Sequence, residues 1–587
     1  MRPTIVGISA HFHDSACCLL RDGQLAAAAQ EERFTRVKHD PSIPKEAFRW
    51  CLREAGVTIA DVDAVAYYED PVKKLDRQLW MGLPDLPLAT PQALFRLDAT
   101  KPERELREIL GFDGEIVVVD HHEAHAASAY YFSGFPEAAV LTVDAVGEWA
   151  TTTYGRADGP HLELLEEVSF PDSIGLLYSA LTAYLGFDVN DAEYKVMGLA
   201  PYGEPAFVDE IRTLIASGEG GQFRLALEYF DFMGGRIFSE KLCQLFGRPA
   251  REPESALDQF AKNVARSLQV VLEEVLLARV AHLHARVPSA HLCLAGGVAL
   301  NCVAIEKIVR QGPFAHVFVQ PAASDAGGAL GAAALAHVRL TGRRPGGPRL
   351  QHVSVGPSFS NTEIARLFAA GAAGVQDFRG RTPELLAAAA ERLASGQVLG
   401  WFHGRMEFGP RALGNRSILA DPRVPSMRDR INELVKKREA FRPFAPAVLE
   451  ERAAAHFELD HAAPFMVETC RVRSPIDLPA VTHVDGSARV QTVARETSPR
   501  FHALLQEFER RTGCPMLLNT SFNLRGEPIV CTPADALRCF IRSELDGLVI
   551  EDFLLDRSGL PASWMEWCRD SSPATPRVVP TGAYTLL

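Results

Sequence analysis

The sequence predicts an α/β protein built from two domains, and three observations carry this prediction. The chain has 587 residues, which is too long for one ordinary hydrophobic core. Short apolar runs rich in β-branched residues are followed by segments with helical periodicity. A segment rich in glycine and proline, residues 339–357, reads as a connection. We therefore expect a first domain at 1–345, a linker at 346–357 and a second domain at 358–587.

The first domain contains an internal repeat. Three predicted strands, with a tight turn before the third, occur twice. The first copy covers residues 4–9, 15–21 and 24–30, and the second covers 138–144, 150–156 and 161–168. Asp22-Gly23 and Asp158-Gly159 are the hairpin signals of the two copies. Two such units, each followed by helices, predict an α/β fold that holds a nucleotide in the cleft between its halves.

Composition narrows the partners and the compartment. Hydrophobic residues make up 47% and charged residues 23% of the chain, which is typical of a soluble globular protein. The net charge of −13 argues against a large nucleic-acid or anionic membrane surface. The eleven cysteines form no CxxC pair, and we find neither a signal peptide nor a membrane span. We expect a cytoplasmic protein with a small-molecule partner.

A metal site is predicted in the first domain. His121 and His125 follow a predicted strand and its N-cap residue Asp120, so on a helix they share one face and can hold a divalent metal. Asp144 ends a second apolar run, and Asp325 follows a third, which would complete a set of two histidines and two aspartates. In the competing interpretation the histidines form a polar helix face and Asp325 only caps a helix.

Two glycine-rich stretches suggest contacts with a nucleotide. The predicted strand 292–295 opens into Gly296-Gly297 and continues to Asn301, and adjacent glycines let the backbone approach a phosphate or ribose. Tight packing alone would also explain this turn. Residues 193–203 contain too many breakers for a regular element and are expected to form a shaped loop.

The second domain carries a run of cationic side chains. Arg405, Arg411 and Arg416 lie within twelve residues between glycines and a proline, a pattern that favours bidentate binding of phosphate or carboxylate. A basic helix is predicted at 427–439, and a strand at 515–518 is followed by a polar turn. The sequence therefore predicts an anion site here.

Taken together, eight motifs resemble the bacterial O-carbamoyltransferase family, whose members modify nodulation factors, antibiotics and sugars. The motifs occur in the right order along nearly the whole chain, at residues 12–14, 31–36, 121–126, 195–203, 295–301, 409–414, 442–446 and 518–523. The resemblance implies an actin-like (duplicated RNase H-like), two-lobed N-terminal domain and a YrdC-like C-terminal domain. It also implies an enzyme that forms carbamoyl adenylate from carbamoyl phosphate and ATP in the C-terminal domain, and carbamoylates a hydroxyl of a small molecule in the other.

The resemblance also assigns roles to individual residues and names the cofactors. Iron(II), or another divalent ion, would bind His121, His125, Asp144 and Asp325, and ATP would arrive with Mg²⁺. The adenylate would contact Lys195, Gly198, Gly296, Gly297 and Asn301. Carbamoyl phosphate and ATP would contact Arg411, Arg416, Lys436, Arg442, Asn519 and Ser521, of which Arg411, Lys436 and Arg442 are expected to be catalytic. His13 is our expected general base for the acceptor hydroxyl.

Several alternatives follow from the same residues. A threonylcarbamoyl-type enzyme acting on tRNA would need a basic stripe, which the net charge of −13 opposes. An actin-like ATP-binding regulator without transfer activity leaves the arginines and the histidine pair unexplained. A metallopeptidase would need Glu where position 122 holds His. The acceptor pocket is expected within 60–115 and 204–255, where no motif is shared, and monomer and homodimer are equally compatible with the sequence.

Overall fold

The computed structural model describes residues 2–81, 98–218, 222–232, 236–369, 374–436, 438–560, 562–564 and 566. These residues form two compact units. Unit 1 contains Met1–Glu31 and His39–Leu350, and unit 2 contains Glu32–Lys38 together with Gln351–Val578. The chain thus divides inside the predicted linker, but the short segment Glu32–Lys38 belongs to unit 2 although the sequence analysis placed it in the first domain. Parts of the expected acceptor regions, at 82–97, 219–221 and 233–235, lie outside the described residues.

The first sheet of unit 1 is organised around a fully buried central strand, β1 (Thr4–Ser9). On one side β1 pairs antiparallel with β2 (Ala16–Arg21), which pairs antiparallel with β3 (Gln24–Gln30). On the other side β1 pairs parallel with β4 (Ala64–Tyr67), and β4 pairs parallel with β5 (Glu115–Val118). The order is therefore β3-β2-β1-β4-β5.

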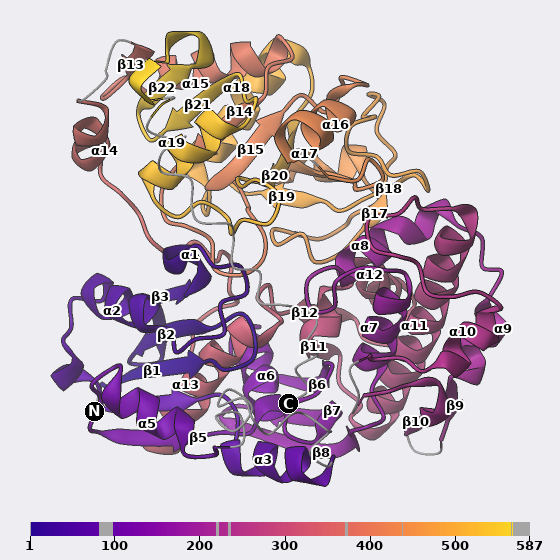
Figure 1. Cartoon of the computed structure of the whole chain (residues 1–587). Helices are drawn as coiled ribbons and strands as arrows, with labels where there is room; N and C mark the ends of the chain where they lie inside the picture. Colours follow the sequence, from indigo (N-terminus) through magenta and orange to yellow (C-terminus); the bar gives the residue numbers. More distant parts are fainter. Residues whose placement is uncertain are drawn as a thin grey trace. The chain divides into compact units, whose positions relative to one another are not determined.

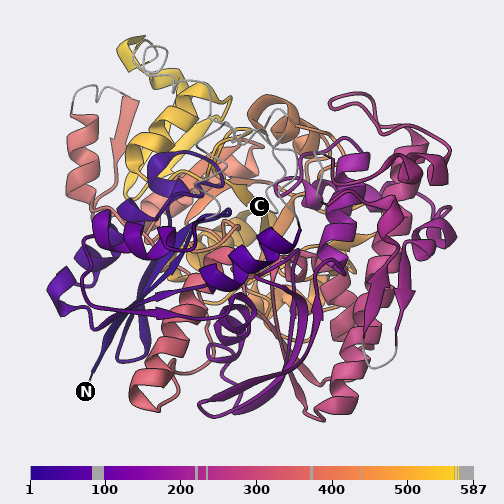
Figure 2. The same ribbon diagram turned by 60° about the horizontal axis from the view of Figure 1, so that its bottom comes forward.

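The second sheet of unit 1 repeats this plan. Strand β6 (Glu137–Val143) pairs antiparallel with β7 (Ala150–Asp158), which pairs antiparallel with β8 (His161–Ser169). On its other edge β6 pairs parallel with β11 (His291–Ala295), and β11 with β12 (His316–Val319). The order β8-β7-β6-β11-β12 matches the first sheet strand for strand, so the predicted repeat is confirmed (Figures 1 and 2). This duplicated α/β plan agrees with the expectation of a two-lobed N-terminal domain.

Helices α6 (His121–Tyr130) and α13 (Asp325–Thr341) pack against each other in unit 1. Small residues permit this approach, since a Cβ added at Gly331 would lie 1.7 Å from the carbonyl oxygen of Ala124. Helix α13 also packs on β1, where a Cβ at Gly7 would lie 1.8 Å from the carbonyl oxygen of Ala329. The close contact brings the N-terminal ends of both helices, and the polar side chains they carry, to one place.

The remaining described elements of unit 1 lie around these two sheets. They are α2 (Lys45–Glu54), α3 (Pro71–Trp80), α5 (Lys101–Glu108), α7 (Ile174–Tyr184), α8 (Glu193–Leu199), α9 (Val208–Thr213), β9 (Ile215–Ser217), β10 (Phe223–Leu225), α10 (Glu240–Phe246), α11 (Gln259–Arg286) and α12 (Cys302–Gln311). The loop expected at 193–203 is wrong: helix α8 and a 3₁₀ turn, Ala200–Tyr202, form there. Gly198 is tolerated because α8 is packed by buried neighbours, and Pro201 falls in the first turn, where its missing N–H costs nothing.

Unit 2 is built on an eight-stranded sheet in the order β13-β22-β21-β14-β15-β20-β16-β19 (Figure 1). Its strands are β13 (Val375–Asp377), β14 (Leu399–Phe402), β15 (Arg416–Ala420), β16 (Ala445–Leu449), β19 (Gln491–Val493), β20 (Met516–Ser521), β21 (Gly547–Ile550) and β22 (Phe553–Asp556). Its helices are α1 (Glu32–Thr35), α14 (Asn361–Phe368), α15 (Thr382–Ala394), α16 (Met427–Arg430), α17 (Glu450–His456), α18 (Pro499–Thr512) and α19 (Pro533–Arg542), and β17 (Cys470–Arg471) pairs with β18 (Ser487–Ala488). The long central strands carry the core of the unit.

Two predicted elements of unit 2 differ in extent from those observed. The strand expected at 515–518 continues to Ser521, because Asn519, Thr520 and Ser521 pair with β15 in an antiparallel ladder. The basic helix expected at 427–439 is a short α-helix followed by a π-helical stretch, Ile431–Lys436. The wider π turn often marks a functional site.

Two further observations concern membrane spans and the cysteines. No helix among the described residues is long and apolar enough to cross a membrane. The ten cysteines that lie within the described part of the chain are all buried and free.

Candidate metal centre and anion site

The metal site predicted from the sequence begins at the N-terminus of α6. The carboxylate of Glu148 accepts hydrogen bonds from the His121 backbone N–H at 2.9 and 3.2 Å. Asp120, the expected side-chain cap, instead accepts from Lys73 and makes no capping hydrogen bond. His122 bonds the Thr142 hydroxyl at 2.6 Å and so takes no part in the metal group, as its helix position predicts.

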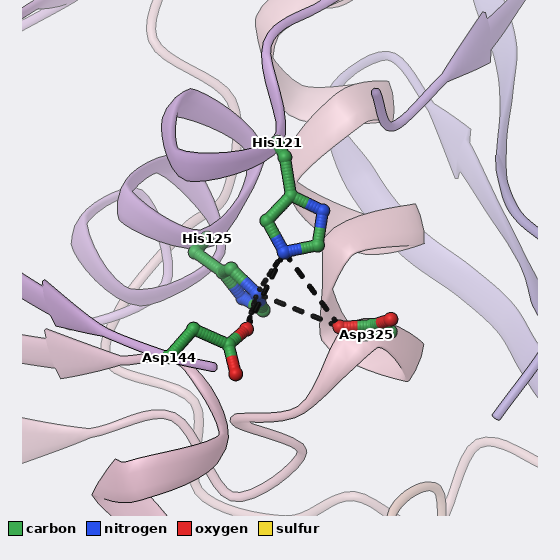
Figure 3. A group of neighbouring side chains, drawn as sticks. All are labelled: His121, His125, Asp144 and Asp325. Carbon is green, nitrogen blue, oxygen red and sulfur yellow. Dashed lines mark hydrogen bonds and ion pairs between the residues drawn. The ribbon is translucent and has the colours of Figure 1, made fainter. Parts of the chain in front are cut away.

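The four predicted metal ligands come together (Figure 3). The Nε2 atoms of His121 and His125 lie 3.0 Å apart. Asp144 Oδ2 is 2.9 Å from His125 Nε2 and 3.3 Å from His121 Nε2, and Asp325 Oδ1 is 3.7 Å from both. One ligand atom from each residue lies within 4.8 Å of all the others. Helix α6 supplies both imidazoles, the end of β6 supplies Asp144, and the start of α13 supplies Asp325.

Burial of these four side chains makes their charged forms costly and shifts their pKa values. His125 is 0% exposed and Asp325 is 2% exposed. Burial lowers the pKa of His121, but hydrogen bonding to Asp144 and the charge of Asp325 outweigh it and raise the pKa to about 9. Burial raises the pKa of Asp144, yet the two histidines hold it well below its usual range. For Asp325 burial dominates and raises the pKa.

These residues fit a divalent transition metal. Two imidazole nitrogens 3.0 Å apart cannot both donate, or both accept, toward one another without conflict, and both also face two buried carboxylates. A cation held by all four resolves that conflict with neutral imidazoles and charged carboxylates. A mixed set of nitrogen and oxygen ligands suits iron(II), zinc and related ions, whereas calcium and magnesium prefer oxygen ligands.

The predicted glycine turn lies against this centre. A Cβ added at Gly297 would lie 3.0 Å from Asp144 Oδ1, and one at Gly296, whose φ is +92°, would lie 2.2 Å from the carbonyl oxygen of Val143. Asn301 caps α12 by accepting from the Ala304 N–H at 3.0 Å. Glycine is therefore required at 296 by both conformation and space, and the turn borders the metal ligands.

Helix α8 carries the other two residues predicted to contact the adenylate, Lys195 and Gly198. The Lys195 ammonium lies 5.6 Å from the centroid of the Phe187 ring. The Cys302 thiol donates to the Met197 sulfur at 3.8 Å, which joins α8 to the start of α12, next to Asn301. The predicted nucleotide residues of unit 1 thus lie on neighbouring elements.

His13 lies in a chain of acids and histidines that the sequence did not reveal. Its Nδ1 is 3.3 Å from Asp14 Oδ2, and His39 bridges Asp14 at 2.8 Å and Asp191 at 3.0 Å. Burial lowers the pKa of His13, but Asp325 and Asp14 outweigh it and raise the pKa to about 9. Asp14 and His39 have φ values of +53° and +54°, so strained backbone flanks this side chain.

The loop that carries Arg405, Arg411 and Arg416, here called the arginine loop, folds around a buried carboxylate that the sequence analysis missed. Glu407 Oε1 accepts from the backbone N–H groups of Leu413 at 2.6 Å and Asn415 at 2.8 Å. Gln491 donates to the Leu413 carbonyl at 2.7 Å. An acidic residue amid arginines was the available signal for Glu407, whereas nothing in the sequence around Gln491 marked it. These bonds fix the backbone of the loop that contains Arg411.

Two residues predicted to bind the anions are engaged with the loop itself. Arg416 is 0% exposed and donates to the carbonyls of His403, Asn415 and Pro357 at 2.9, 3.0 and 2.8 Å. Its guanidinium carbon lies 3.6 Å from the Phe402 ring centroid, and burial lowers its pKa to about 10. Asn519 is 1% exposed and donates to Gln491 at 2.8 Å and to the Ala412 carbonyl at 3.3 Å. In this structure both side chains support the loop.

Lys436 joins the end of the π-helix to the end of β20. Its ammonium donates to Ser521 O at 2.5 Å and to Asn523 Oδ1 at 2.7 Å, and Asn523 accepts in turn from the Ser521 hydroxyl at 2.8 Å. Burial lowers the pKa of Lys436 well below its usual range. Arg442 Nη1 lies 3.7 Å from Glu439. The structure thus brings Lys436 and Ser521 together as predicted and adds Asn523 to them.

Comparison with known proteins identifies the class. The family model described as carbamoyltransferase N-terminus matches residues 4–80 and 103–334, and the one described as carbamoyltransferase C-terminus matches residues 390–557. The chain therefore belongs to the carbamoyltransferase family, a class of enzymes that transfer a carbamoyl group. The two matches fall on the two units.

Three relatives illustrate the range of the family. An uncharacterized protein of Synechocystis sp. is 45% identical over 95% of this chain and 97% of its own length. The nodulation protein NolNO of Sinorhizobium fredii is 40% identical over 94% of this chain and 80% of its own length. The 3'-hydroxymethylcephem-O-carbamoyltransferase of Streptomyces clavuligerus is 37% identical over 44% of this chain and 48% of its own length.

Solved structures give weaker similarity. HypF from T. kodakarensis covers 58% of this chain and 48% of its own at 14% identity and a TM-score of 0.31. The ROK hexokinase from Thermus thermophilus covers 58% of this chain and 100% of its own at 16% identity and a TM-score of 0.29.

Proposed function

We propose that this enzyme is an ATP-dependent O-carbamoyltransferase that carbamoylates a hydroxyl group of a small molecule. The observation that carries the proposal is the meeting of four metal ligands and a glycine turn at Asp144, because it offers a place for a cation and an adenylate side by side. The hydroxymethylcephem named for one relative supports a small-molecule acceptor, and a sugar or another natural product is the class we expect. The net charge of −13 supports an acceptor other than nucleic acid.

Unit 2 would form the activated donor. In sum, carbamoyl phosphate, ATP and water give carbamoyl adenylate, pyrophosphate and phosphate, as the carbamate oxygen bonds to the α-phosphorus and pyrophosphate leaves. Arg411, Lys436 and Arg442 would neutralise phosphoryl oxygens, with Mg²⁺ carried by the nucleotide. Ser521 would contact the same anions, while Arg416 and Asn519 would act through the loop that they hold.

Unit 1 would transfer the carbamoyl group. The acceptor oxygen attacks the carbamoyl carbon, the bond to the adenylate oxygen breaks, and AMP leaves. His121, His125, Asp144 and Asp325 would hold a divalent metal, with iron(II) the family expectation, and that ion would supply Lewis acidity toward the donor. His13, whose Nδ1 lies 3.3 Å from Asp14, would take the proton of the acceptor hydroxyl through its other ring nitrogen. It would do so as neutral imidazole once a bound metal offsets the charge of Asp325, which is the largest contribution that raises the pKa of His13.

The glycine turn would position the adenylate for this step. Gly297 is partly exposed beside Asp144, Gly296 is buried against Val143, and Asn301 opens α12 directly after the turn. Lys195 and Gly198 on α8 lie beside the same helix start. A mixed anhydride hydrolyses readily, so close placement of acceptor, base and donor also protects it from water.

The first test is an assay without acceptor. The full-length protein is incubated with ATP, Mg²⁺ and carbamoyl phosphate, pyrophosphate release is followed, and carbamoyl adenylate is sought by mass spectrometry. Arg411→Ala should abolish the product, and Arg510→Ala, an exposed arginine of α18 paired with Glu507, is the matched control. If the wild-type protein binds ATP but forms no carbamoyl adenylate with any divalent metal, an ATP-binding regulator becomes the better reading.

A second assay supplies the acceptor. Hydroxylated sugars and a hydroxymethylcephem are added to the wild-type enzyme loaded with iron(II), and carbamoylated product is measured together with AMP. AMP release that depends on the acceptor would support transfer, and release that depends on tRNA instead would redirect the assignment to a threonylcarbamoyl-type reaction.

A further inference from the structure

We propose that the segment Glu32–Lys38 is a positioning element of the adenylate-forming site, although it lies near the N-terminus of the chain. The segment belongs to unit 2, whereas the residues on both sides of it belong to unit 1. It contacts the loop that carries Arg411 and Arg416, and the stretch 528–531, which follows the strand β20 that ends at Ser521. The inference rests on the proposed function, because it assigns the segment to the first half-reaction.

The first contact fixes the start of the arginine loop. Arg33 is a buried residue of α1, and its Nη2 donates to the carbonyl of Gly409 at 2.9 Å. Its Nη1 lies 2.7 Å from Glu32 Oε1, which compensates the buried charge. Gly409 has a φ of +111° and stands two residues before Arg411. A hydrogen bond to this carbonyl therefore restrains the backbone from which Arg411 projects.

The second contact fixes the chain that follows β20. Arg36 donates to the carbonyls of Pro528 and Ile529, each at 2.7 Å. Its own φ is +61°, an unusual conformation for arginine that directs the side chain into these bonds. Because one guanidinium binds two successive carbonyls, it restrains both the position and the orientation of this backbone.

A small hydrophobic cluster joins the two contacts. Phe34 packs against a group formed by Met406, Ala412, Ile529 and Cys531. Met406 and Ala412 come from the arginine loop, and Ile529 and Cys531 come from the stretch held by Arg36. The segment therefore lies between both stretches with an aromatic ring and two guanidinium groups.

A short series of hydrogen bonds connects Arg36 to Lys436. The carbonyl of Glu527, next to the Pro528 that Arg36 binds, accepts from the Asn523 side chain at 2.7 Å. The Asn523 side chain in turn accepts from the Lys436 ammonium at 2.7 Å. Movement of the 527–529 backbone would thus displace Asn523 and the ammonium that it holds. Neither Arg33 nor Arg36 needs to touch substrate to influence catalysis.

The test uses the full-length protein and separates the half-reactions. Arg36→Ala is assayed for pyrophosphate release from ATP and carbamoyl phosphate, and separately for transfer from added carbamoyl adenylate to an acceptor. We expect kcat of adenylate formation to fall by about tenfold to a hundredfold, because a loop misplaced by an ångström loses much of its catalytic orientation. The Kd for ATP and transfer from the added donor should change little.

Three further measurements make the test decisive. Added guanidinium ion should restore part of the adenylate formation in Arg36→Ala, and Arg33→Lys, which keeps one donor, should lose less than Arg33→Ala. Arg49→Ala, an exposed arginine of α2, is the matched control. Normal adenylate formation in Arg36→Ala, or an equal loss of both half-reactions with a lower melting temperature, would overturn the inference. Failure of the wild-type protein to form carbamoyl adenylate would instead remove the proposed function itself.

Discussion

The two candidate sites use their polar side chains in opposite ways. In unit 1 two imidazoles and two carboxylates face one another, and their ligand atoms all lie within 4.8 Å. In unit 2 Arg416, Asn519 and Lys436 spend most of their hydrogen bonds on backbone carbonyls and neighbouring amides. The first arrangement suits a cation that four side chains would hold directly, and the second is a scaffold that holds a loop in place.

The difference follows from what each site is expected to bind. A metal ion needs a few atoms at short range, which side chains on three rigid elements supply. Two polyanionic substrates that change shape during the reaction need many donors in a defined array, which a held loop provides. Substitution of a ligand in unit 1 should therefore abolish metal binding and carbamoyl transfer. Substitutions in unit 2 should lower the rate of adenylate formation by amounts that differ from residue to residue.

The largest effect should follow removal of a metal ligand. His125→Ala deletes one of four ligands, and we expect transfer from added carbamoyl adenylate to fall by about a thousandfold or more, since Lewis-acid contacts contribute several kcal/mol. Pyrophosphate release in unit 2 should persist. The metal content of purified His125→Ala, measured by mass spectrometry, should fall together with transfer. His161 is an exposed histidine at the start of β8, and the control variant His161→Ala should retain both metal and transfer. Equal loss of both half-reactions would contradict the division of labour.

Lys436→Met should impair adenylate formation and leave transfer intact, which is the opposite of the result expected for His125→Ala. The substitution removes the buried ammonium that joins Ser521 and Asn523, and adenylate formation should fall by about a hundredfold to a thousandfold. Transfer from added carbamoyl adenylate and metal content should stay at the wild-type level. The comparison with His125→Ala then tests both directions, and a loss of metal in Lys436→Met would argue against two separate sites.

The loop supports should show smaller, graded effects. Gln491→Ala removes the donor to the Leu413 carbonyl and the partner of Asn519, so we expect about 1–2 kcal/mol of lost stability in unit 2. Adenylate formation should fall by about tenfold at saturating substrates. Urea unfolding combined with the pyrophosphate assay measures both quantities. A change in activity as large as that of Lys436→Met would mean that Gln491 contacts the substrates directly.

The sequence predicted unit 1 better than unit 2 for a physical reason. His121, His125, Asp144 and Asp325 follow regular elements, and the ends of parallel strands and packed helices converge, so their meeting could be expected from spacing. The orientation of Arg416 depends on the carbonyls of a folded loop, which no local pattern encodes. Glu148 replaced Asp120 as the helix cap, and Glu32–Lys38 joined unit 2, through contacts between residues distant in sequence. The loop predicted at 193–203 was wrong because packing stabilises a helix there despite Gly198 and Pro201, which usually interrupt helices.

The last prediction concerns stability rather than activity, at Glu31, the last residue of unit 1 before the segment that belongs to unit 2. Its carboxylate accepts from the backbone N–H groups of Glu46 and Ala47 at the start of α2, but burial raises its pKa from 4.5 to about 7. The folded protein therefore binds this proton more tightly than the unfolded chain does. Stability from this group is complete below about pH 4.5 and is lost as the pH rises through 7, with a total of about 3 kcal/mol.

Glu31→Gln removes the ionisation, and its single acceptor oxygen keeps one of the two hydrogen bonds to α2. The lost hydrogen bond lowers stability by the same amount at every pH, so the slope with pH isolates the contribution of the carboxyl group. Between about pH 4.5 and 7 the free energy of unfolding should fall less steeply in the variant than in the wild type. Above about pH 7 the difference between the two free energies should become constant, since Glu31 is then ionised in both the folded and the unfolded wild type. Urea unfolding across this range, analysed as a difference between the two proteins, cancels the titration of the metal ligands. Parallel curves would place the ionisation of Glu31 below the range measured, and would mean that its two backbone hydrogen bonds outweigh its burial.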